Sequence, residues 1–325
     1  MTYRKLAQLI GVSPATVSKA LSGSKEISDE TAELIRRAAE EHGVIRPAYH
    51  REHRPKRVAV LVPEIVSIFY SSTATALTSY LEKRGFETSI MICGFSDERF
   101  YELLDLIECE KFADGVIVLT TCKMPRRRDI PIVSITSELH DSRCDSVGVD
   151  METGIDDAIG HLVSLGHRHI GYIGERNTQT KQKGFCKALE KRQIDFSERD
   201  IFVSSQRFEM IGVEGAEYFL RMRNRPTAFI TAYDEVAIGA MHIFTGHGLK
   251  VPEDVSIIGI NDIPSSAFAQ TPLTTIRTFS GEVISIASEL LIERITDRCA
   301  AIQKITLGCE LIIRNTTSKP KEKIQ

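Results

Sequence analysis

The stretch "GVSPATVSKALSG", from Gly11 to Gly23, has the composition of a turn followed by a short helix. Gly11 interrupts the preceding apolar pattern and can adopt a positive φ. Ser13 is a favourable N-cap, and Pro14 stands at the first helical position, where its missing N–H costs nothing. The pattern predicts a helix from Pro14 to about Leu21.

This helix has one apolar side and one polar side. Its spacing predicts that Val17 and Leu21 are buried. The residues expected to face solvent are Ala15, Ser18, Lys19 and Ser22.

Two further helices flank this one. Before it, Leu6, Leu9 and Ile10 form an apolar stripe at i, i+3 and i+4. After it, Ser28 caps a third helix that ends at Gly43. The stripe of this third helix consists of Ala32, Ile35 and Ala39. Two helices joined by a Gly-x-Ser turn, with a third that closes the core, are typical of a helix-turn-helix domain.

The charge is distributed unevenly along the chain. The net charge of the 325 residues is only −3. Residues 1–57, however, contain 11 Lys and Arg against 7 Asp and Glu, whereas the other 268 residues contain 30 against 37. A basic leading segment on an acidic body favours contact between that segment and phosphate.

The composition changes again between the head and the body. The stretch "RPAYHREHRPKR" (46–57) has two prolines, two histidines and five basic residues, without apolar periodicity. It is expected to be a linker.

From Val58 onward, short apolar runs alternate with helical segments. The first five strands are predicted at 57–63, 87–93, 114–120, 130–136 and 145–150, with helices at about 69–84 and 153–165. The rhythm restarts near residue 159, with strands at 169–174, 200–205, 227–232 and 255–260. This alternation predicts two doubly wound parallel α/β sheets. Because ligands of such sheets bind beyond the carboxyl ends of the strands, a site between the two lobes is expected.

Several classes of protein are disfavoured. The seven cysteines are scattered without a Cys-x-x-Cys pair, which argues against disulfides and zinc. The two histidines of "GHRHIG" are expected to be structural, and no metal site is predicted. There is no Walker loop and no Gly-x-Ser-x-Gly, so neither an enzyme nor a cofactor is expected. With no signal peptide and no apolar run near ~20 residues, a cytoplasmic protein without membrane contact is expected.

The chain resembles the lactose repressor / galactose repressor family of transcriptional regulators. The resemblance runs from Thr2 to about Arg314. It rests on "TVSKAL", "HLVSLGHRHIGYIG" and "VPEDVSIIGINDI…PLTTIR", in that order. It implies a homodimer whose helix-turn-helix heads bind successive major grooves of operator DNA. It also implies a small effector between the lobes of the body, which has the fold of a periplasmic binding protein.

The resemblance divides the chain into four parts. The helix-turn-helix domain is 1–45, the basic linker 46–57, the effector-binding and dimerisation domain 58–318, and the polar tail 319–325. Within the body, lobe 1 is expected at about 58–158 and 280–308, and lobe 2 at about 159–279 and 309–318. The polar tail lacks a leucine heptad, which favours a dimer over a tetramer.

The family's DNA contacts are transferred to the head residue by residue. The resemblance implies base contacts for Pro14, Ala15 and Lys19, of which Lys19 can donate to guanine and the other two can make apolar contacts. The expected phosphate contacts, some of which are also simple caps, are Thr2, Thr16, Ser18, Ser22, Ser28 and Thr31.

The linker departs from the family pattern. It is shorter, and no leucine occurs between Val44 and Arg57 to act as a minor-groove wedge. It is therefore expected to act through charge, which makes binding depend steeply on salt. The basic residues expected near phosphates are Arg46, Arg51, Arg54, Lys56 and Arg57.

The effector site departs from the family as well. Lys181 replaces an arginine, Tyr233 replaces an asparagine, and Asn261 replaces the first acid of an Asp-Asp pair. Asp262 follows, and Phe69 and Tyr70 are candidates for stacking on a sugar, although each aromatic residue can equally be part of the core. A neutral sugar is the first expectation. The alternatives are a phosphorylated or acidic effector attracted by Lys181, a protein corepressor, and a sugar-binding transport protein that shares the two-lobed body.

Overall fold

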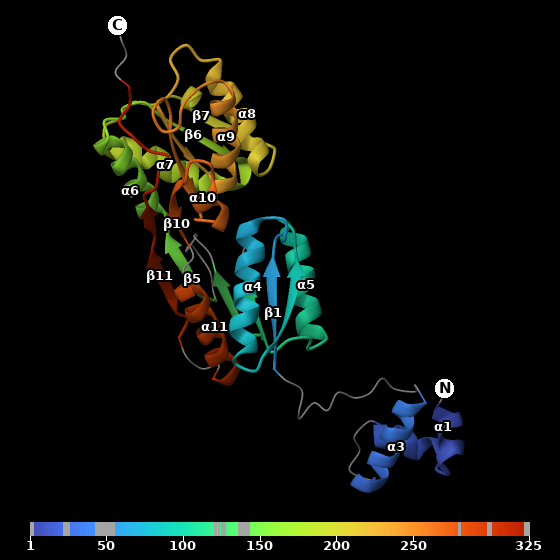
Figure 1. The fold of residues 1–325 in the computed structure, drawn as a ribbon. Coiled ribbons are helices and arrows are strands. Elements are labelled where there is room, and N and C mark those ends of the chain that lie inside the picture. The colour runs from blue at the N-terminus through green and yellow to red at the C-terminus, as the bar shows by residue number, and fades with distance from the viewer. Residues whose placement is uncertain are drawn as a thin grey trace. The chain divides into compact units, whose positions relative to one another are not determined.

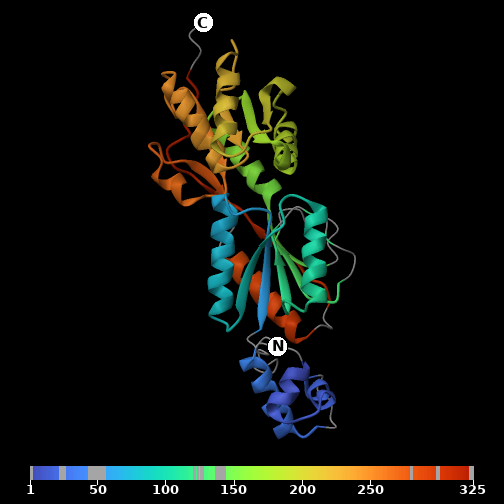
Figure 2. The same ribbon diagram turned by 90° about the vertical axis from the view of Figure 1, so that its right-hand side faces the viewer.

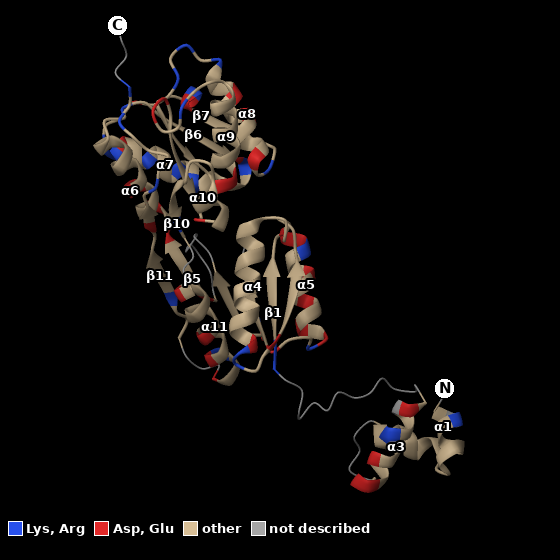
Figure 3. Ribbon diagram, in the orientation of Figure 1, with Lys and Arg blue, Asp and Glu red and all other residues tan. Residues whose placement is uncertain are grey.

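The chain folds into two units, Met1–Pro55 and Lys56–Gln325. Three short helices form the core of the first unit. The computed structural model describes residues 3–21, 27–42, 56–119, 122, 124, 128–135, 144–278, 281–297 and 301–321. The helices of the first unit are α1 (Tyr3–Ile10), α2 (Pro14–Leu21) and α3 (Asp29–Glu41) (Figure 1). The helix predicted from Pro14 is thus confirmed. The acidic first turn of α3, whose charged residues are red in Figure 3, suits the positive end of the helix dipole.

Two details of the head's core differ from the prediction. Leu9 is 57% exposed, and Ala7 is buried instead. In α2, Ala20 is buried beside Val17, whereas Leu21 is only partly buried. In both helices an alanine faces the core because its small side chain lets the helices pack closely. The predicted stripe of α3 is confirmed, since Ala32, Ile35 and Ala39 are all buried.

The second unit begins with a six-stranded parallel sheet, in the order β11-β5-β4-β3-β1-β2. Its strands are β1 (Arg57–Val62), β2 (Glu87–Ile92), β3 (Gly115–Val118), β4 (Ile132–Ile135), β5 (Asp145–Asp150) and β11 (Lys304–Gly308). Its helices are α4 (Ile68–Glu82), α5 (Asp97–Cys109) and α11 (Gly281–Thr296). We call this sheet with these helices lobe 1.

Alternate residues of β1 face the two sides of that sheet. Val58 and Val60 belong to the core that includes Leu77 of α4, whereas Ala59 and Leu61 pack with the core of α5. Figures 1 and 2 show α4 and α5 on opposite sides of β1. Burial on both faces explains why the strand has an unbroken apolar sequence.

The second sheet has the order β12-β10-β9-β8-β6-β7, in which only β12 is antiparallel to its neighbour. Its strands are β6 (Ile170–Glu175), β7 (Ile201–Ser204), β8 (Ala228–Thr231), β9 (Ser256–Ile260), β10 (Thr274–Arg277) and β12 (Glu310–Ile312). Its α-helices are α6 (Met151–Ser164), α7 (Gln179–Lys191), α8 (Glu209–Leu220), α9 (Asp234–Gly246) and α10 (Pro264–Phe268). Two short 3₁₀ turns are η1 (Arg176–Thr178) and η2 (Glu198–Asp200). We call this sheet with these elements lobe 2.

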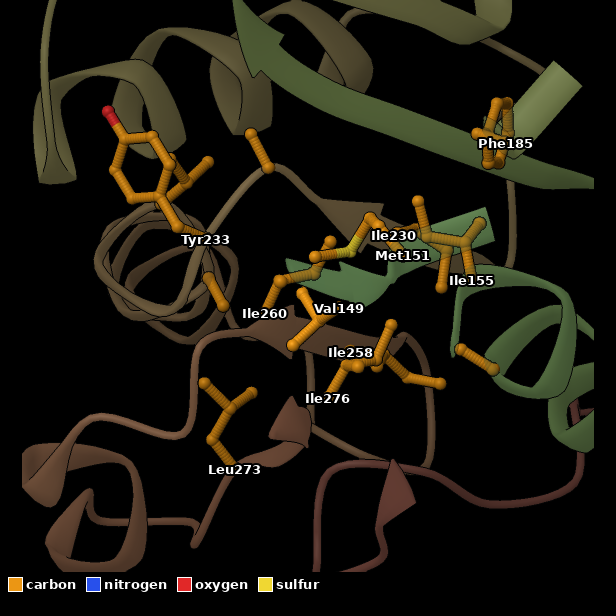
Figure 4. Close-up of a cluster of buried hydrophobic side chains, with 14 of the residues drawn as sticks. Val149, Met151, Ile155, Phe185, Ile230, Tyr233, Ile258, Ile260, Leu273 and Ile276 are labelled. Carbon is orange, nitrogen blue, oxygen red and sulfur yellow. The ribbon is translucent and has the colours of Figure 1, made fainter. Parts of the chain in front are cut away.

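The two lobes share chain and core. The described chain passes between them after β5, after β10, and between β11 and β12. At the first crossing, Val149 and Met151 lie beside Ile230, Ile258 and Ile260 of lobe 2 (Figure 4). The expected fold class, a helical head with two doubly wound α/β lobes, is confirmed.

His167 ties the start of β6 to the end of the described chain. Its ring is buried, with Nδ1 2.8 Å from Thr227 Oγ1 and Nε2 2.9 Å from the carbonyl oxygen of Ser318. A carbonyl only accepts, so Nε2 carries the hydrogen and Nδ1 accepts from the threonine. The expected structural role of this histidine is therefore supported by its contacts. His169 next to it pairs with Asp200 instead, at 2.7 Å.

We expect the stability of the body to fall as the pH is lowered below about 6.5, and His167 to contribute to that fall. Burial lowers the pKa of His167, so at mildly acidic pH the unfolded chain binds a proton that the folded chain excludes. Each such proton changes the free energy of unfolding by up to about 1.4 kcal/mol per pH unit. Urea unfolding at pH 7.5 and 5.5 measures this change. His167→Gln should show a smaller loss between the two pH values, and an unchanged loss would contradict the assignment.

Candidate DNA interface and effector site

The exposed face of α2 brings together the three residues for which base contacts are predicted. Pro14, Ala15 and Lys19 are all exposed, whereas Val17 and Ala20 on the opposite side are buried. The helix begins at Pro14 because Ser13 accepts a hydrogen bond from the backbone N–H of Thr16 at 3.0 Å. The cap therefore fixes where the exposed face starts.

The hydroxyls with predicted phosphate contacts are positioned by the same caps. Thr16 Oγ1 lies 2.8 Å from Ser13 Oγ, and Thr31 Oγ1 lies 2.7 Å from Ser28 Oγ. Ser28 accepts from the backbone N–H of Thr31 at 3.3 Å, so it caps α3. Ser18 is exposed on α2. The remaining predicted phosphate contacts lie outside the described residues: Thr2, Ser22, Arg46, Arg51 and Arg54.

The end of the basic linker is engaged by lobe 1. Arg57 is the first residue of β1, and its guanidinium donates to Glu87 at 2.8 Å and lies 5.1 Å over the ring of Phe112. Lys56 is exposed. Of the linker cations expected near phosphates, Arg57 thus already has an acidic and an aromatic partner in the body.

In the body, the carboxyl ends of the strands carry the polar and aromatic residues of a second site. Lys181 of α7 donates from Nζ to the carbonyl oxygen of Ala232 at 2.7 Å, just beyond the end of β8. The same Nζ lies 6.0 Å from the ring of Tyr233. Burial lowers the pKa of Lys181 to about 8, against the opposing effect of nearby carboxylates such as Asp234 and Glu235. The lysine is therefore a cation balanced by acids of its own lobe.

Tyr233 stands at the edge of the lobe 2 core. In Figure 4 its hydroxyl points away from the buried cluster of Ile230 and Ile260. That hydroxyl accepts a hydrogen bond from the backbone N–H of Phe208 at 3.1 Å. Phe208 has a φ of 58°, and such strained non-glycine residues cluster at functional sites.

Arg207, just before Phe208, joins the two lobes. Its Nη2 donates to Oε1 of Glu64 in lobe 1 at 2.5 Å, and its Nε forms an ion pair with Oε2 of Glu175 in lobe 2 at 3.0 Å. The guanidinium lies 5.0 Å from the ring of Phe95 and 4.9 Å from that of Phe208.

The aromatic candidates of lobe 1 lie on the same side. Tyr70 is 5.1 Å from Phe69 and 6.5 Å from Phe95, measured between ring centroids. Burial, with Glu64 nearby, raises the pKa of Tyr70 to about 12, so its hydroxyl stays protonated and can donate. Arg207 and Glu175 also act on the pKa of Tyr70 and of Tyr233. The charge of Glu175 thus acts on the pKa of Tyr70, Lys181 and Tyr233 alike.

The last two predicted effector residues are arranged differently. Asn261 and Asp262 follow β9 with φ values of 111° and 52°. The carboxylate of Asp262 accepts from Arg277 Nε at 2.9 Å and from Arg314 NH2 at 2.6 Å. Both of its oxygens are engaged within lobe 2, so its arrangement is that of a structural residue. The side-chain oxygen of Asn261 accepts a long hydrogen bond from Thr278 Oγ1, at 3.4 Å.

Buried hydrogen bonds fix this loop after β9. Asp234 accepts from the backbone N–H of Ile263 at 2.8 Å and from Thr275 Oγ1 at 2.5 Å. Asp234 is fully buried, which raises its pKa. The first turn of α9 therefore holds the segment that carries Asn261.

Sequence reasoning missed five residues of this site: Glu64, Phe95, Glu175, Arg207 and Phe208. Each one ends a strand or lies within four residues of its carboxyl end. The strand-end rule, applied to every strand of both sheets, would have selected them. No regular spacing links them, because the Glu64–Arg207 bond spans 143 positions.

Among the described residues, no His, Cys, Asp and Glu side chains form a group of three or more suited to a metal ion. No helix in that part of the chain is long and apolar enough to cross a membrane.

Comparison with known proteins adds independent information. Residues 2–46 match the model of bacterial regulatory proteins of the lacI family, and residues 159–317 match a periplasmic binding protein-like domain. The chain is 28% identical over 333 residues to the HTH-type transcriptional repressor PurR of Vibrio parahaemolyticus, covering 98% of this chain and 99% of that protein.

Solved structures have the same architecture. A LacI family transcriptional regulator from Enterococcus faecium with bound ribose has a TM-score of 0.70 and 25% identity, covering 82% of this chain and all of the other. The lac repressor dimer bound to operator and the anti-inducer ONPF has a TM-score of 0.74 and 22% identity, covering 98% and 99% of the two chains. The second likeness extends over head and body.

Proposed function

Because the chain belongs to the lacI family of bacterial regulatory proteins and is a DNA-binding transcriptional repressor, we propose that α2 contacts the bases of its operator and that a neutral sugar bound between the lobes regulates it. The family consists of transcriptional regulators, not enzymes. Its members bind operator DNA and small-molecule effectors and act as dimers.

The observation that carries the DNA proposal is the exposed face of α2. Pro14, Ala15 and Lys19 lie together there, opposite a buried face. A helix of this kind presents its N-terminal residues to base edges in the major groove. Lys19 is the cation of that face, so we assign it the donor role toward guanine O6 or N7.

Replacing Lys19 with alanine should relax specificity at one base pair per half-site, at a cost of about 1–3 kcal/mol there. Binding of the full-length repressor to an operator selected from a random pool, and to operators with single changes, measures the effect. Lys5→Ala, an exposed lysine of α1, is the matched control. A loss that is uniform over all sequences would instead make Lys19 a phosphate contact.

Three residues that converge between the lobes carry the effector proposal. Tyr70 and Tyr233 supply rings and hydroxyls, and Lys181 supplies an N–H donor beside them. Rings with hydroxyl, amide and ammonium groups are suited to the faces and hydroxyls of a sugar. The ribose bound to the Enterococcus relative supports a sugar as the class of ligand.

The charges around the site favour a neutral ligand over a phosphorylated one. Lys181 and Arg207 are accompanied by four acids, Glu64, Glu175, Asp234 and Glu235; burial raises the pKa of the last three, that of Glu235 to about 7. An anionic effector would meet these acids in a partly buried place, where repulsion is weakly screened.

A panel of neutral sugars and sugar phosphates tests the proposal by thermal unfolding. A bound ligand at 100 times its dissociation constant adds about 2.7 kcal/mol to the free energy of unfolding. We expect at least one neutral sugar to raise the melting temperature, and Lys181→Met to abolish that rise. A rise with sugar phosphates alone would overturn the neutral sugar. No rise with any compound, while operator binding persists, would overturn regulation by a sugar.

A further inference from the structure

Arg207 contacts both lobes, and it lies outside the family motifs of this sequence. It lies between β7 and α8 in lobe 2, whereas Glu64 and Phe95 follow β1 and β2 in lobe 1. One guanidinium therefore forms a short ion pair across the lobes and a second one, with Glu175, inside its own lobe. Its faces meet an aromatic ring from each lobe, Phe95 and Phe208.

The setting makes these contacts stronger than those of a surface pair. The side chains of Arg207, Glu64 and Glu175 are only 29%, 20% and 6% exposed. Ion pairs shielded to this degree are screened less by water and salt than exposed ones. The planar guanidinium can bind two carboxylates and stack on rings at the same time, which a lysine cannot.

The lobe 2 side of the bridge is held in place. The backbone N–H of Phe208 donates to Tyr233 Oη, so the residue after Arg207 is fixed to the start of α9. Burial raises the pKa of Glu175, and the charge of Arg207 acts against this. Of the two partners of Arg207, Glu175 thus belongs to the same lobe as the arginine, whereas Glu64 belongs to lobe 1.

We propose that Arg207 is a positioning residue that holds lobe 2 closed on lobe 1 by bridging Glu175 and Glu64. We call these three residues the latch. The fraction of molecules that are closed then depends on the latch before any ligand binds. A ligand that needs the closed form binds with an affinity scaled by that fraction. Only this last consequence rests on the proposed effector site.

The latch is tested by distances between spin labels on the two lobes. The full-length protein carries one label at Glu98 of α5 and one at Glu217 of α8, and both positions are exposed. The labels are attached to a genetically encoded ketone amino acid, so that the seven native cysteines do not react. Labelled chains are diluted with unlabelled ones, so that distances within one chain dominate. We expect one short distance in the parent protein and an added longer one in Arg207→Gln.

Arg192→Gln is the matched control. Arg192 pairs with Asp156 inside lobe 2, and their side chains are 22% and 20% exposed, close to the values of Arg207 and Glu64. It should destabilise lobe 2 without changing the distance between the lobes. Glu64→Gln should open the lobes as Arg207→Gln does, and the double variant should open them no further, because both changes remove the same bond.

The outcomes separate the latch from the proposed sugar. If Arg207→Gln keeps the parent distance while circular dichroism shows it folded, the latch is wrong. If Arg207→Gln fails to fold, Glu64→Gln, which keeps the arginine, decides by the same measurement. These distances are recorded without sugar, so a panel in which no sugar binds overturns the effector proposal and leaves the latch standing.

Discussion

Replacing Arg294 with alanine is expected to lower the free energy of unfolding of the body by about 3–5 kcal/mol. Arg294 of α11 and Asp145 of β5 are 6% and 8% exposed. Nε donates to Oδ2 at 2.7 Å and NH2 to Oδ1 at 3.0 Å, and NH2 also donates to the carbonyl oxygen of Ala301 at 2.7 Å. Without the guanidinium, the carboxylate stays buried, and among the described residues it keeps the hydrogen bond from the backbone N–H of Gln303, at 2.7 Å.

Urea unfolding of the variant measures this loss. Arg84→Ala is the matched control. Arg84 pairs with Glu289, which lies on α11 as Arg294 does, and the two side chains are 48% and 44% exposed. A pair this exposed is worth about 1 kcal/mol or less. Arg294→Met combined with Asp145→Leu should recover much of the loss, since no buried charge is then left alone. If Arg294→Ala cost no more than Arg84→Ala, the buried pair would not stabilise lobe 1 as we infer.

Gly239→Ala should destabilise lobe 2 by about 3 kcal/mol or more, at the upper end of overpacking effects. Helices α8 and α9 cross at two glycines. A Cβ on Gly239 would lie 2.1 Å from the backbone oxygen of Glu209, and a Cβ on Gly212 would lie 2.0 Å from the backbone oxygen of Val236. Backbone atoms on both sides leave no flexible side chain to give way, so the helices must move apart.

The same helix offers the control for this prediction. Gly246, at the end of α9, has nothing within 4 Å of an added Cβ. Gly246→Ala should therefore raise the stability by up to about 1 kcal/mol, because it reduces the entropy of the unfolded chain without a clash. Thermal unfolding of both variants decides the matter. Equal effects of the two substitutions would mean that the helix crossing tolerates a methyl group.

The sequence predicts the elements of the sheets well, but not all of their ends. The strand predicted at 145–150 is observed at Asp145–Asp150, with each of its residues except the last buried. The strands predicted at 114–120 and 130–136 are shorter, at Gly115–Val118 and Ile132–Ile135. Apolar residues such as Leu119 and Ile130 lie beyond the hydrogen-bonded ladder, and composition alone does not mark where a ladder stops.

The site is predictable only in part. Lys181 and Tyr233 can be named as candidates from the sequence because their neighbours form motifs, and their contacts with an effector stay a prediction. Glu64 and Arg207 are not among the residues that the sequence marks as candidates, because the bond between them depends on how the two lobes meet. Asp262 was predicted as an effector contact, yet it is engaged by Arg277 and Arg314, because β10 and the chain after β12 bring these arginines to it. Interactions between distant segments are set by tertiary packing, which local sequence does not encode.

The order of the strands places the latch far from the side where the two lobes are joined. The two sheets are joined along one side, where β11 and β12 are neighbours in the chain and each is the edge strand of its sheet. Glu64, Phe95 and Arg207 follow β1, β2 and β7, and Glu175 is the last residue of β6. These strands are the two outermost ones at the opposite side of each sheet. With strands about 4.8 Å apart, the latch lies roughly 20 Å from that joined side. At this distance from the joined side, a weak interaction is enough to resist rotation of one lobe away from the other. A gap of about 4 Å at Arg207 corresponds to a rotation of the lobes by only about 10°.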